Sequence, residues 1–167
     1  MRGPNRKHKL SHSKAYLSLG SNVSPEKNIQ FALDQLRRIF GETVPSSTYL
    51  TKAVGFEGPD FLNLVVKIET DLDPATLIDQ LHSIEEMTGR VTGTKAFNDR
   101  TLDIDVLIYD DCINLDLNIP RDEILKHGFV LEPLAELYPD GLHPIEKITF
   151  LELWNRLKDD LDASQKI

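Results

Sequence analysis

The sequence has only one cysteine and no long apolar run, and each shortage excludes a class of protein. A single cysteine, Cys112, cannot support an internal disulfide framework and suits a reducing compartment. No stretch reaches the roughly 20 apolar residues that a membrane-spanning helix needs. The basic N-terminus is not followed by the apolar segment of a signal peptide. We therefore expect a cytoplasmic protein without a membrane partner.

Positive charge is the third shortage. The 167 residues include 19 lysines and arginines against 27 aspartates and glutamates, which gives a formal net charge of −8. This balance disfavours broad affinity for nucleic acid. Residues 1–14 contain five of the cations and no acid, so we expect residues 1–13 to form a disordered basic tail. The alternative is an anion-binding arm.

The pattern of apolar residues and turn signals predicts an α+β fold. Residues 14–167 contain no repeat or linker and are expected to form one domain. The expected elements are strands over residues 14–19, 47–54, 61–69 and 101–109, helices that begin at Ser24–Pro25 and Asp73–Pro74, and helical segments over 132–137 and 150–161. This order predicts a ferredoxin-like α/β sandwich with an antiparallel sheet and a C-terminal helical extension.

Alternating residues assign the side chains of the two best strands to faces. The expected core residues are Leu62, Leu64, Val66 and Ile68 in one strand, Leu102, Ile104, Val106 and Ile108 in the other, and Leu77, Leu81 and Ile84 in the helix between them. The residues between these apolar positions should therefore face away from the core.

Asp103 and Asp105 are the sharpest chemical signal. In a strand, side chains two positions apart point the same way, about 7 Å apart at the backbone. Two neighbouring carboxylates repel each other unless a cation or proton lies between them. Mg²⁺ prefers oxygen ligands and often uses one or two carboxylates together with substrate phosphates. Arg100 could contact a phosphate from the start of the strand. The alternative is an exposed sheet face with solvated acids.

Weaker signals lie in the preceding strand and helix. Phe61 and Asn63 should share the face of the acids, where an aromatic ring and an amide suit a flat heterocycle. The alternative is an ordinary strand aromatic with a solvated asparagine. His82 and Glu85 lie beside the core stripe of the helix, where a solvated face is the alternative.

Together these segments resemble the 6-hydroxymethyl-7,8-dihydropterin pyrophosphokinase family of folate biosynthesis, over residues 15–144. The matching motifs are Gly20–Asn22, Phe61–Asn63, Ile84–Glu85, Gly89–Arg90, Arg100–Asp105, Ile119–Pro120 and Gly128–Leu134. The resemblance implies the same sandwich fold. It also implies transfer of the β,γ-pyrophosphoryl group of ATP, the co-substrate, to the pterin's hydroxymethyl oxygen, with release of AMP.

The resemblance also implies roles for particular residues. Arg90 and Arg100 would be catalytic residues, and Asp103 and Asp105 would bind two Mg²⁺ ions. The pterin pocket would contain Thr51, Val54, Phe61, Asn63, Phe97 and Phe129. The ATP site would contain His82, Glu85, Val106, Arg121 and His127.

The chain departs from the family where the triphosphate would bind. Asn98–Asp99 replaces a small pair, and Lys95 is the only cation in residues 92–96, where the family is rich in arginine. Arg121 stands where the family usually has histidine, and His127 where it usually has arginine. We therefore expect weaker ATP binding. The alternatives are a non-catalytic pterin-binding relative and a different two-metal phosphotransferase; a nucleic-acid module does not suit the acidic body.

Overall fold

The computed structural model describes residues 12–53, 57–89 and 101–167, and its centre is a sheet of antiparallel strand pairs. The strands are β1 (Ser13–Ser21), β2 (Val44–Pro45), β3 (Tyr49–Thr51), β4 (Phe61–Thr70), β5 (Asp103–Tyr109) and β6 (Gln165–Lys166). Their order is β5-β1-β4-β3-β6, and β2 also pairs with β4. This arrangement confirms the expected ferredoxin-like α+β fold, in which β1 and β4 form the centre.

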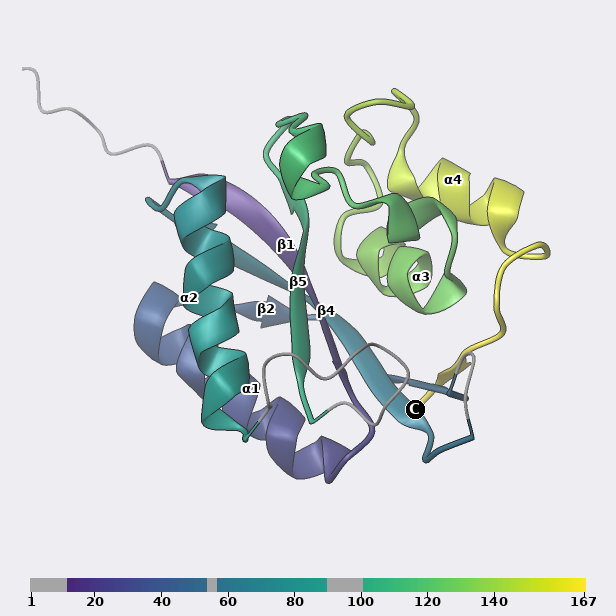
Figure 1. The fold of residues 1–167 in the computed structure, drawn as a ribbon. Helices are drawn as coiled ribbons and strands as arrows, with labels where there is room; N and C mark the ends of the chain where they lie inside the picture. Colours follow the sequence, from purple (N-terminus) through teal and green to yellow (C-terminus); the bar gives the residue numbers. More distant parts are fainter. Residues whose placement is uncertain (1–11, 54–56, 90–100) are drawn as a thin grey trace, which may run out of the picture.

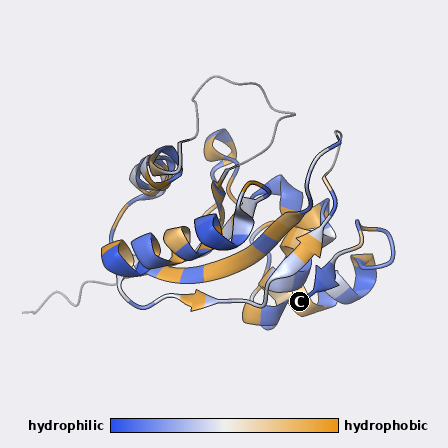
Figure 2. Cartoon of the chain, turned by 90° about the horizontal axis from the view of Figure 1, so that it is seen from below, coloured by the Kyte–Doolittle hydropathy of each residue, from blue (hydrophilic) through white to orange (hydrophobic). Residues whose placement is uncertain are grey.

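Helices cover both faces of the sheet, which gives three layers (Figure 1). The helices are α1 (Pro25–Phe40), α2 (Pro74–Met87), α3 (Gly128–Leu137) and α4 (Phe150–Leu157), with short 3₁₀ turns η1 (Leu115–Leu117) and η2 (Asp122–Leu125). In Figure 1, α1 and α2 lie on one side of the sheet and α3 and α4 on the other. The strands carry long hydrophobic stretches, whereas the helices show both hydrophilic and hydrophobic residues (Figure 2).

The face toward α1 and α2 is closed and apolar. Its buried side chains include Ala15, Leu17, Leu19, Leu64, Val66, Ile68, Ile104 and Val106 from the strands and Leu36, Leu77, Leu81 and Ile84 from the helices. Burial of this much apolar surface is the main source of stability in the sandwich. The expected core stripes of β4 and α2 are thus confirmed.

The face toward α3 and α4 is divided. Its apolar part includes Tyr16, Val65, Leu107 and Ile108, which pack with Val130, Leu131, Leu134 and Phe150. The expectation that Ile108 shares a face with Val106 is therefore wrong. The register between β1 and β5 shifts here, with Leu17 opposite Val106 but Tyr16 opposite Ile108. An inserted residue in a strand reverses the alternation beyond it.

Several expected boundaries also need correction. The strand expected over residues 47–54 is limited to β3, because Thr51 is already opposite Phe61, the first residue of β4. Helix α3 begins at Gly128, before the expected 132–137, and α4 ends at Leu157, before residue 161.

The two predicted helix starts differ in how they are capped. The Asp73 carboxylate accepts a hydrogen bond from the Thr76 amide at 2.9 Å, as its position predicts. Ser24 occupies the N-cap position of α1 with a left-handed φ of 40°. Within the described residues its side chain caps no backbone N–H. Proline in the first turn is present in both helices.

The first strand begins one residue before its expected start at residue 14. Strand β1 begins at Ser13, and the Nδ1 atom of the preceding His12 lies 2.7 Å from an Asp71 carboxylate oxygen. Residues 1–11 of the expected tail lie outside the described residues. In the described part of the chain, no helix combines the length and the apolar character needed to cross a bilayer.

Candidate active site

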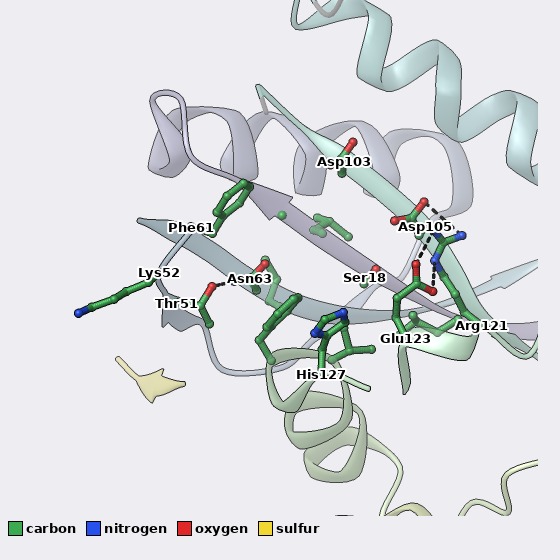
Figure 3. A pocket seen from close by; sticks show the side chains of 16 residues that line it. Ser18, Thr51, Lys52, Phe61, Asn63, Asp103, Asp105, Arg121, Glu123 and His127 are labelled. Carbon is green, nitrogen blue, oxygen red and sulfur yellow. Dashed lines mark hydrogen bonds and ion pairs between the residues drawn. The ribbon is translucent and has the colours of Figure 1, made fainter. Parts of the chain in front are cut away.

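The part of the divided face that α3 and α4 leave open is a cleft of about 280 Å³. Its floor comes from β1, β4 and β5, and its sides from β3, η2 and the start of α3. Figure 3 shows Thr51, Asn63 and Phe61 toward one end, and Asp105, Arg121 and Glu123 toward the other. We call these the amide end and the acid end.

At the acid end, Asp103 and Asp105 lie on the same face of β5, as the alternation predicted. Their strand partners on β1 are Gly20 and Ser18, so small residues lie beside both carboxylates. Both aspartates are half-buried. The geometry therefore concentrates negative charge where the cleft floor has little side-chain bulk.

The acid pair fits a magnesium ion that arrives with a ligand. Among residues 12–53, 57–89 and 101–167, no group of three acid, histidine or cysteine side chains could hold a metal alone. Mg²⁺ often takes only one or two carboxylates and completes its shell with water and phosphate oxygens. Asp103 and Asp105 suit that mode of binding.

Arg121 supplies a positive charge next to the acid pair. Its backbone amide donates to the carbonyl of Leu107 on β5 at 2.9 Å, which ties the segment to the strand of the aspartates. Its guanidinium meets Glu123 through Nε and Nη2 at 3.0 and 3.1 Å, a two-point contact. Its Nη1 lies 3.6 Å from the Asp105 carboxylate. Glu123 thus fixes the plane of the guanidinium and directs the remaining nitrogen toward Asp105.

At the amide end, Asn63 is 7% exposed and donates to the Thr51 hydroxyl at 2.8 Å. This bond fixes the amide's orientation and leaves its carbonyl oxygen and second N–H as potential contacts. Gly20 lies beside this amide, and a β-carbon there would come within 3.0 Å of Asn63 Oδ1. Glycine therefore preserves the close approach of β1 to Asn63. Phe61, on the next position of this strand face, also lines the cleft.

An aromatic pair forms the side wall at the start of α3. The rings of His127 and Phe129 stack with centroids 4.9 Å apart and an interplanar angle of 22°. Both residues line the cleft, and Phe129 is half-buried. His127 Nδ1 lies 2.7 Å from an Asp162 carboxylate oxygen, from a segment 35 residues later. The structure thus brings Phe61, Asn63, Thr51 and the aromatic pair around one space.

Three expected nucleotide contacts lie elsewhere. Glu85 is 3% exposed, and its carboxylate accepts a hydrogen bond from the Ile104 amide at 2.7 Å. The alternative of a solvated glutamate is therefore wrong. Glu85 connects α2 to β5 at Ile104, the residue between Asp103 and Asp105. Val106 packs in the closed core, and His82 is exposed on α2. None of the three lines the cleft, and their contact with ATP stays a prediction.

Four expected site residues lie outside the described residues: Arg90, Arg100, Val54 and Phe97. Conversely, the cleft contains residues that the sequence reasoning missed. Glu123, Lys52 and Ser18 line it, and Asp162 borders its aromatic wall. Glu123 could have been noticed from the sequence, because it lies two residues after Arg121, which stands where the family usually has histidine. Asp162 had none, since only the fold brings it near His127.

Comparison with known proteins identifies the family of the chain. The family described as "7,8-dihydro-6-hydroxymethylpterin-pyrophosphokinase (HPPK)" matches residues 16–139. The chain belongs to this family. The match includes both ends of the cleft, the Arg121–Glu123 pair and the aromatic wall.

Relatives with this family's name match most of the chain. A 2-amino-4-hydroxy-6-hydroxymethyldihydropteridine pyrophosphokinase of Haemophilus influenzae is 37% identical over 140 residues, which are 80% of this chain and 87% of that protein. The "Folic acid synthesis protein fol1" of Schizosaccharomyces pombe is 39% identical over 146 residues. That match is 82% of this chain but only 20% of the fission yeast protein.

A solved structure shows the same fold. The HPPK-DHPS A437G protein of Plasmodium falciparum, crystallised with STZ-DHP, superposes with a TM-score of 0.69 and 14% identity. The superposition covers 92% of this chain and 48% of the Plasmodium chain. This chain thus spans most of the Haemophilus protein but only part of the Schizosaccharomyces and Plasmodium proteins.

Proposed function

We propose that this protein transfers the β,γ-pyrophosphoryl group of ATP to the hydroxymethyl oxygen of 6-hydroxymethyl-7,8-dihydropterin and releases AMP, as a step of folate biosynthesis. One observation carries the proposal. The acid end and the amide end belong to a single cleft, so a phosphate chain and a flat heterocycle could meet within it. Membership of the pyrophosphokinase family supports the same reaction.

The chemistry requires positioning rather than a covalent protein intermediate. The pterin's hydroxymethyl oxygen forms a bond to the β-phosphorus, and the bond from that phosphorus to the oxygen bridging the α-phosphate breaks. AMP leaves with the bridging oxygen, and the hydroxyl proton is released. Such a transfer depends on in-line alignment and on neutralising charge at the phosphate oxygens.

The acid end is suited to the triphosphate. Asp103 and Asp105 would hold Mg²⁺, two ions in our proposal, which supplies positive charge to the phosphate oxygens when bound. Arg121, fixed by Glu123, offers a guanidinium beside Asp105. Arg90 and Arg100 complete the proposed set of cations. His127, Glu85, His82 and Val106 remain proposed nucleotide contacts, with Glu85 acting through the backbone of β5.

The amide end is suited to the pterin. The Asn63 carbonyl and amide can pair with a heterocycle edge that offers both donors and acceptors. Phe61 and Phe129 provide aromatic surface for stacking, and Thr51 holds the amide in place. Val54 and Phe97 are proposed to complete the pocket. We also propose a cytoplasmic location and no nucleic-acid partner, on composition alone.

The test is AMP formation from ATP and Mg²⁺ with and without 6-hydroxymethyl-7,8-dihydropterin. We expect AMP only when the pterin is present. Pterin binding without AMP would indicate a non-catalytic relative. AMP or ADP formation that does not depend on the pterin would indicate a different phosphotransferase. Either outcome would contradict the proposed reaction.

ATP affinity is a second readout, because several expected phosphate contacts are replaced. A fluorimetric ATP titration should give a weak dissociation constant. Tight nucleotide binding would mean that Arg121 and other cations compensate fully for the replaced arginines.

A further inference from the structure

We propose that the C-terminal strap, residues 162–167, holds the heterocycle end of the cleft in shape, and that Asp162 is a positioning residue for pterin binding. This inference rests on the proposed function for the identity of the ligand. The contacts that support it lie on both sides of the amide end, on α3 and on β3.

The first side is the aromatic wall at the start of α3. The Asp162 carboxylate lies 2.7 Å from His127 Nδ1, and the His127 ring stacks on Phe129. A carboxylate partner selects the ring form that carries its proton on Nδ1 and restricts rotation of the ring. The Asp162 carbonyl also packs so closely on Gly128 that a β-carbon there would clash with it. Asp162 therefore restrains both His127 and Gly128 at the start of α3.

The second side is the short strand β3, which carries Thr51. In the strap, β6 pairs antiparallel with β3, with Lys166 opposite Tyr49 and Gln165 opposite Leu50. The Ile167 amide donates to the Thr48 carbonyl at 3.0 Å. Thr51, the last residue of β3, in turn accepts the hydrogen bond that orients Asn63. A strand as short as β3 forms few hydrogen bonds with β4, so pairing with β6 on its other side stabilises it.

A second cavity explains why these contacts matter. It has a volume of about 560 Å³ and shares Thr51, Lys52 and Phe129 with the cleft. Asp162 and Ser164 of the strap also line it. On the side of this cavity, Phe129 borders open space, so core packing restrains only part of the ring. The strap lines this cavity and is itself held to α3 by a 2.9 Å hydrogen bond from the Ser164 hydroxyl to the Glu132 carboxylate.

The acid end should be independent of the strap. In the sheet order, β1, β4 and β3 separate β5, which carries Asp103 and Asp105, from β6. Loosening the strap should therefore weaken pterin binding more than ATP binding, in which His127 is only one of several proposed contacts. A general loss of folding would weaken both.

The experiment compares Asp162→Ala with Asp162→Asn, which keeps an acceptor for His127, and with Asp160→Ala, an exposed acid two residues before Asp162. Pterin and ATP dissociation constants are measured separately by fluorescence titration of the full chain. We expect Asp162→Ala to weaken pterin binding about five- to tenfold, the loss of roughly one hydrogen bond. Asp162→Asn should restore most of it, and Asp160→Ala should match wild type.

Two results would overturn the inference: unchanged pterin binding in Asp162→Ala, or equal losses for pterin and ATP. Hydrogen exchange without any ligand gives an independent readout. Amides of residues 48–51 and 128–131 should exchange faster in Asp162→Ala, and equal exchange would also contradict the strap's role. Wild-type protein that binds no pterin would instead contradict the proposed function, while the exchange result would still test the strap.

Discussion

The two faces of the central sheet share the same strands but differ in how completely they are covered. Toward α1 and α2, apolar side chains of β1, β4 and β5 are buried along the whole sheet. Toward α3 and α4, the strand residues of the apolar cluster are Tyr16, Val65 and the residues beside the bulge, Leu107 and Ile108. Next to this cluster, the same face forms the cleft. One face therefore stabilises the fold, and the incomplete cover of the other creates the site.

The difference between the two faces is present within single strands. In β1, Leu17 is fully buried in the closed core, whereas the next residue, Ser18, lines the cleft. In β5, Ile104 is buried between two half-exposed acids, Asp103 and Asp105. Because side chains alternate, a rigid core can hold reactive groups on the opposite side of the same backbone.

The largest expected effect comes from the open face. Asp103→Ala or Asp105→Ala should abolish AMP formation while the protein stays folded, because the proposed Mg²⁺ ligands are lost. The measurements are AMP release and the circular dichroism spectrum. Asp111→Ala, an exposed acid beyond β5, is the control and should behave as wild type. Near-normal turnover in either cleft variant would refute the metal assignment.

On the closed face, the expected effect is on stability. Leu17→Ala should lower the free energy of unfolding by about 2–5 kcal/mol, because it leaves a cavity in the core. Its neighbour gives the matched comparison, since Ser18→Ala should change stability by about 1 kcal/mol or less. Urea denaturation measures both. Equal destabilisation by the two variants would remove the distinction between the faces.

Within the cleft, Glu123→Gln should separate the acid end from the amide end. The change removes the charged partner that fixes Arg121, so the KM for ATP should rise about tenfold, as expected for a hydrogen bond to a charged group. Pterin affinity should not change. Asp116→Asn, an exposed acid of η1, is the control. Tighter ATP binding in Glu123→Gln would show that Glu123 repels the triphosphate instead of orienting Arg121.

The smallest expected effect concerns Glu136 of α3, which accepts hydrogen bonds from Ser47 and from Tyr49 of β3. Burial alone would raise the pKa of Glu136, but hydrogen bonds from Ser47 and Tyr49 outweigh it and lower that pKa. The bonds should therefore stabilise the fold above about pH 4.5, and this contribution should disappear as pH falls through the lowered value. Glu136→Gln should cost about 1 kcal/mol at pH 7.

Urea denaturation of Glu136→Gln and wild type from pH 7 to pH 3 tests the sign. The stability difference should shrink toward acid pH, and Glu42→Gln, at an exposed position, should show no such trend. A difference that grows as pH falls would contradict the direction assigned to the pKa of Glu136.

The sequence was most informative where structure is local. Alternation in β4 and the proline-marked helix starts predicted the closed core, because strand and helix periods determine which residues are buried. The same alternation predicted that Asp103 and Asp105 share a face. It failed at Ile108, because a bulge is set by pairing with β1 and leaves no mark in the strand itself.

Other features depended on contacts between distant segments. The start of α3 was missed because Gly128 and Pro133 are poor helix formers, and packing on the sheet outweighs their propensity. The burial of Glu85 could not be predicted from the sequence, since its partner, the Ile104 amide, belongs to another element. The Asp162–His127 contact likewise depends on the path of the chain after α4.

The most direct test of the divided cleft is a pair of binding titrations on two variants, Asp105→Ala and Asn63→Ala. The account predicts that Asp105→Ala still binds the pterin but forms no AMP, and that Asn63→Ala still binds ATP but loses the pterin. If both variants lose both ligands, or if Asn63→Ala binds the pterin as wild type does, the assignment of one ligand to each end of the cleft is wrong.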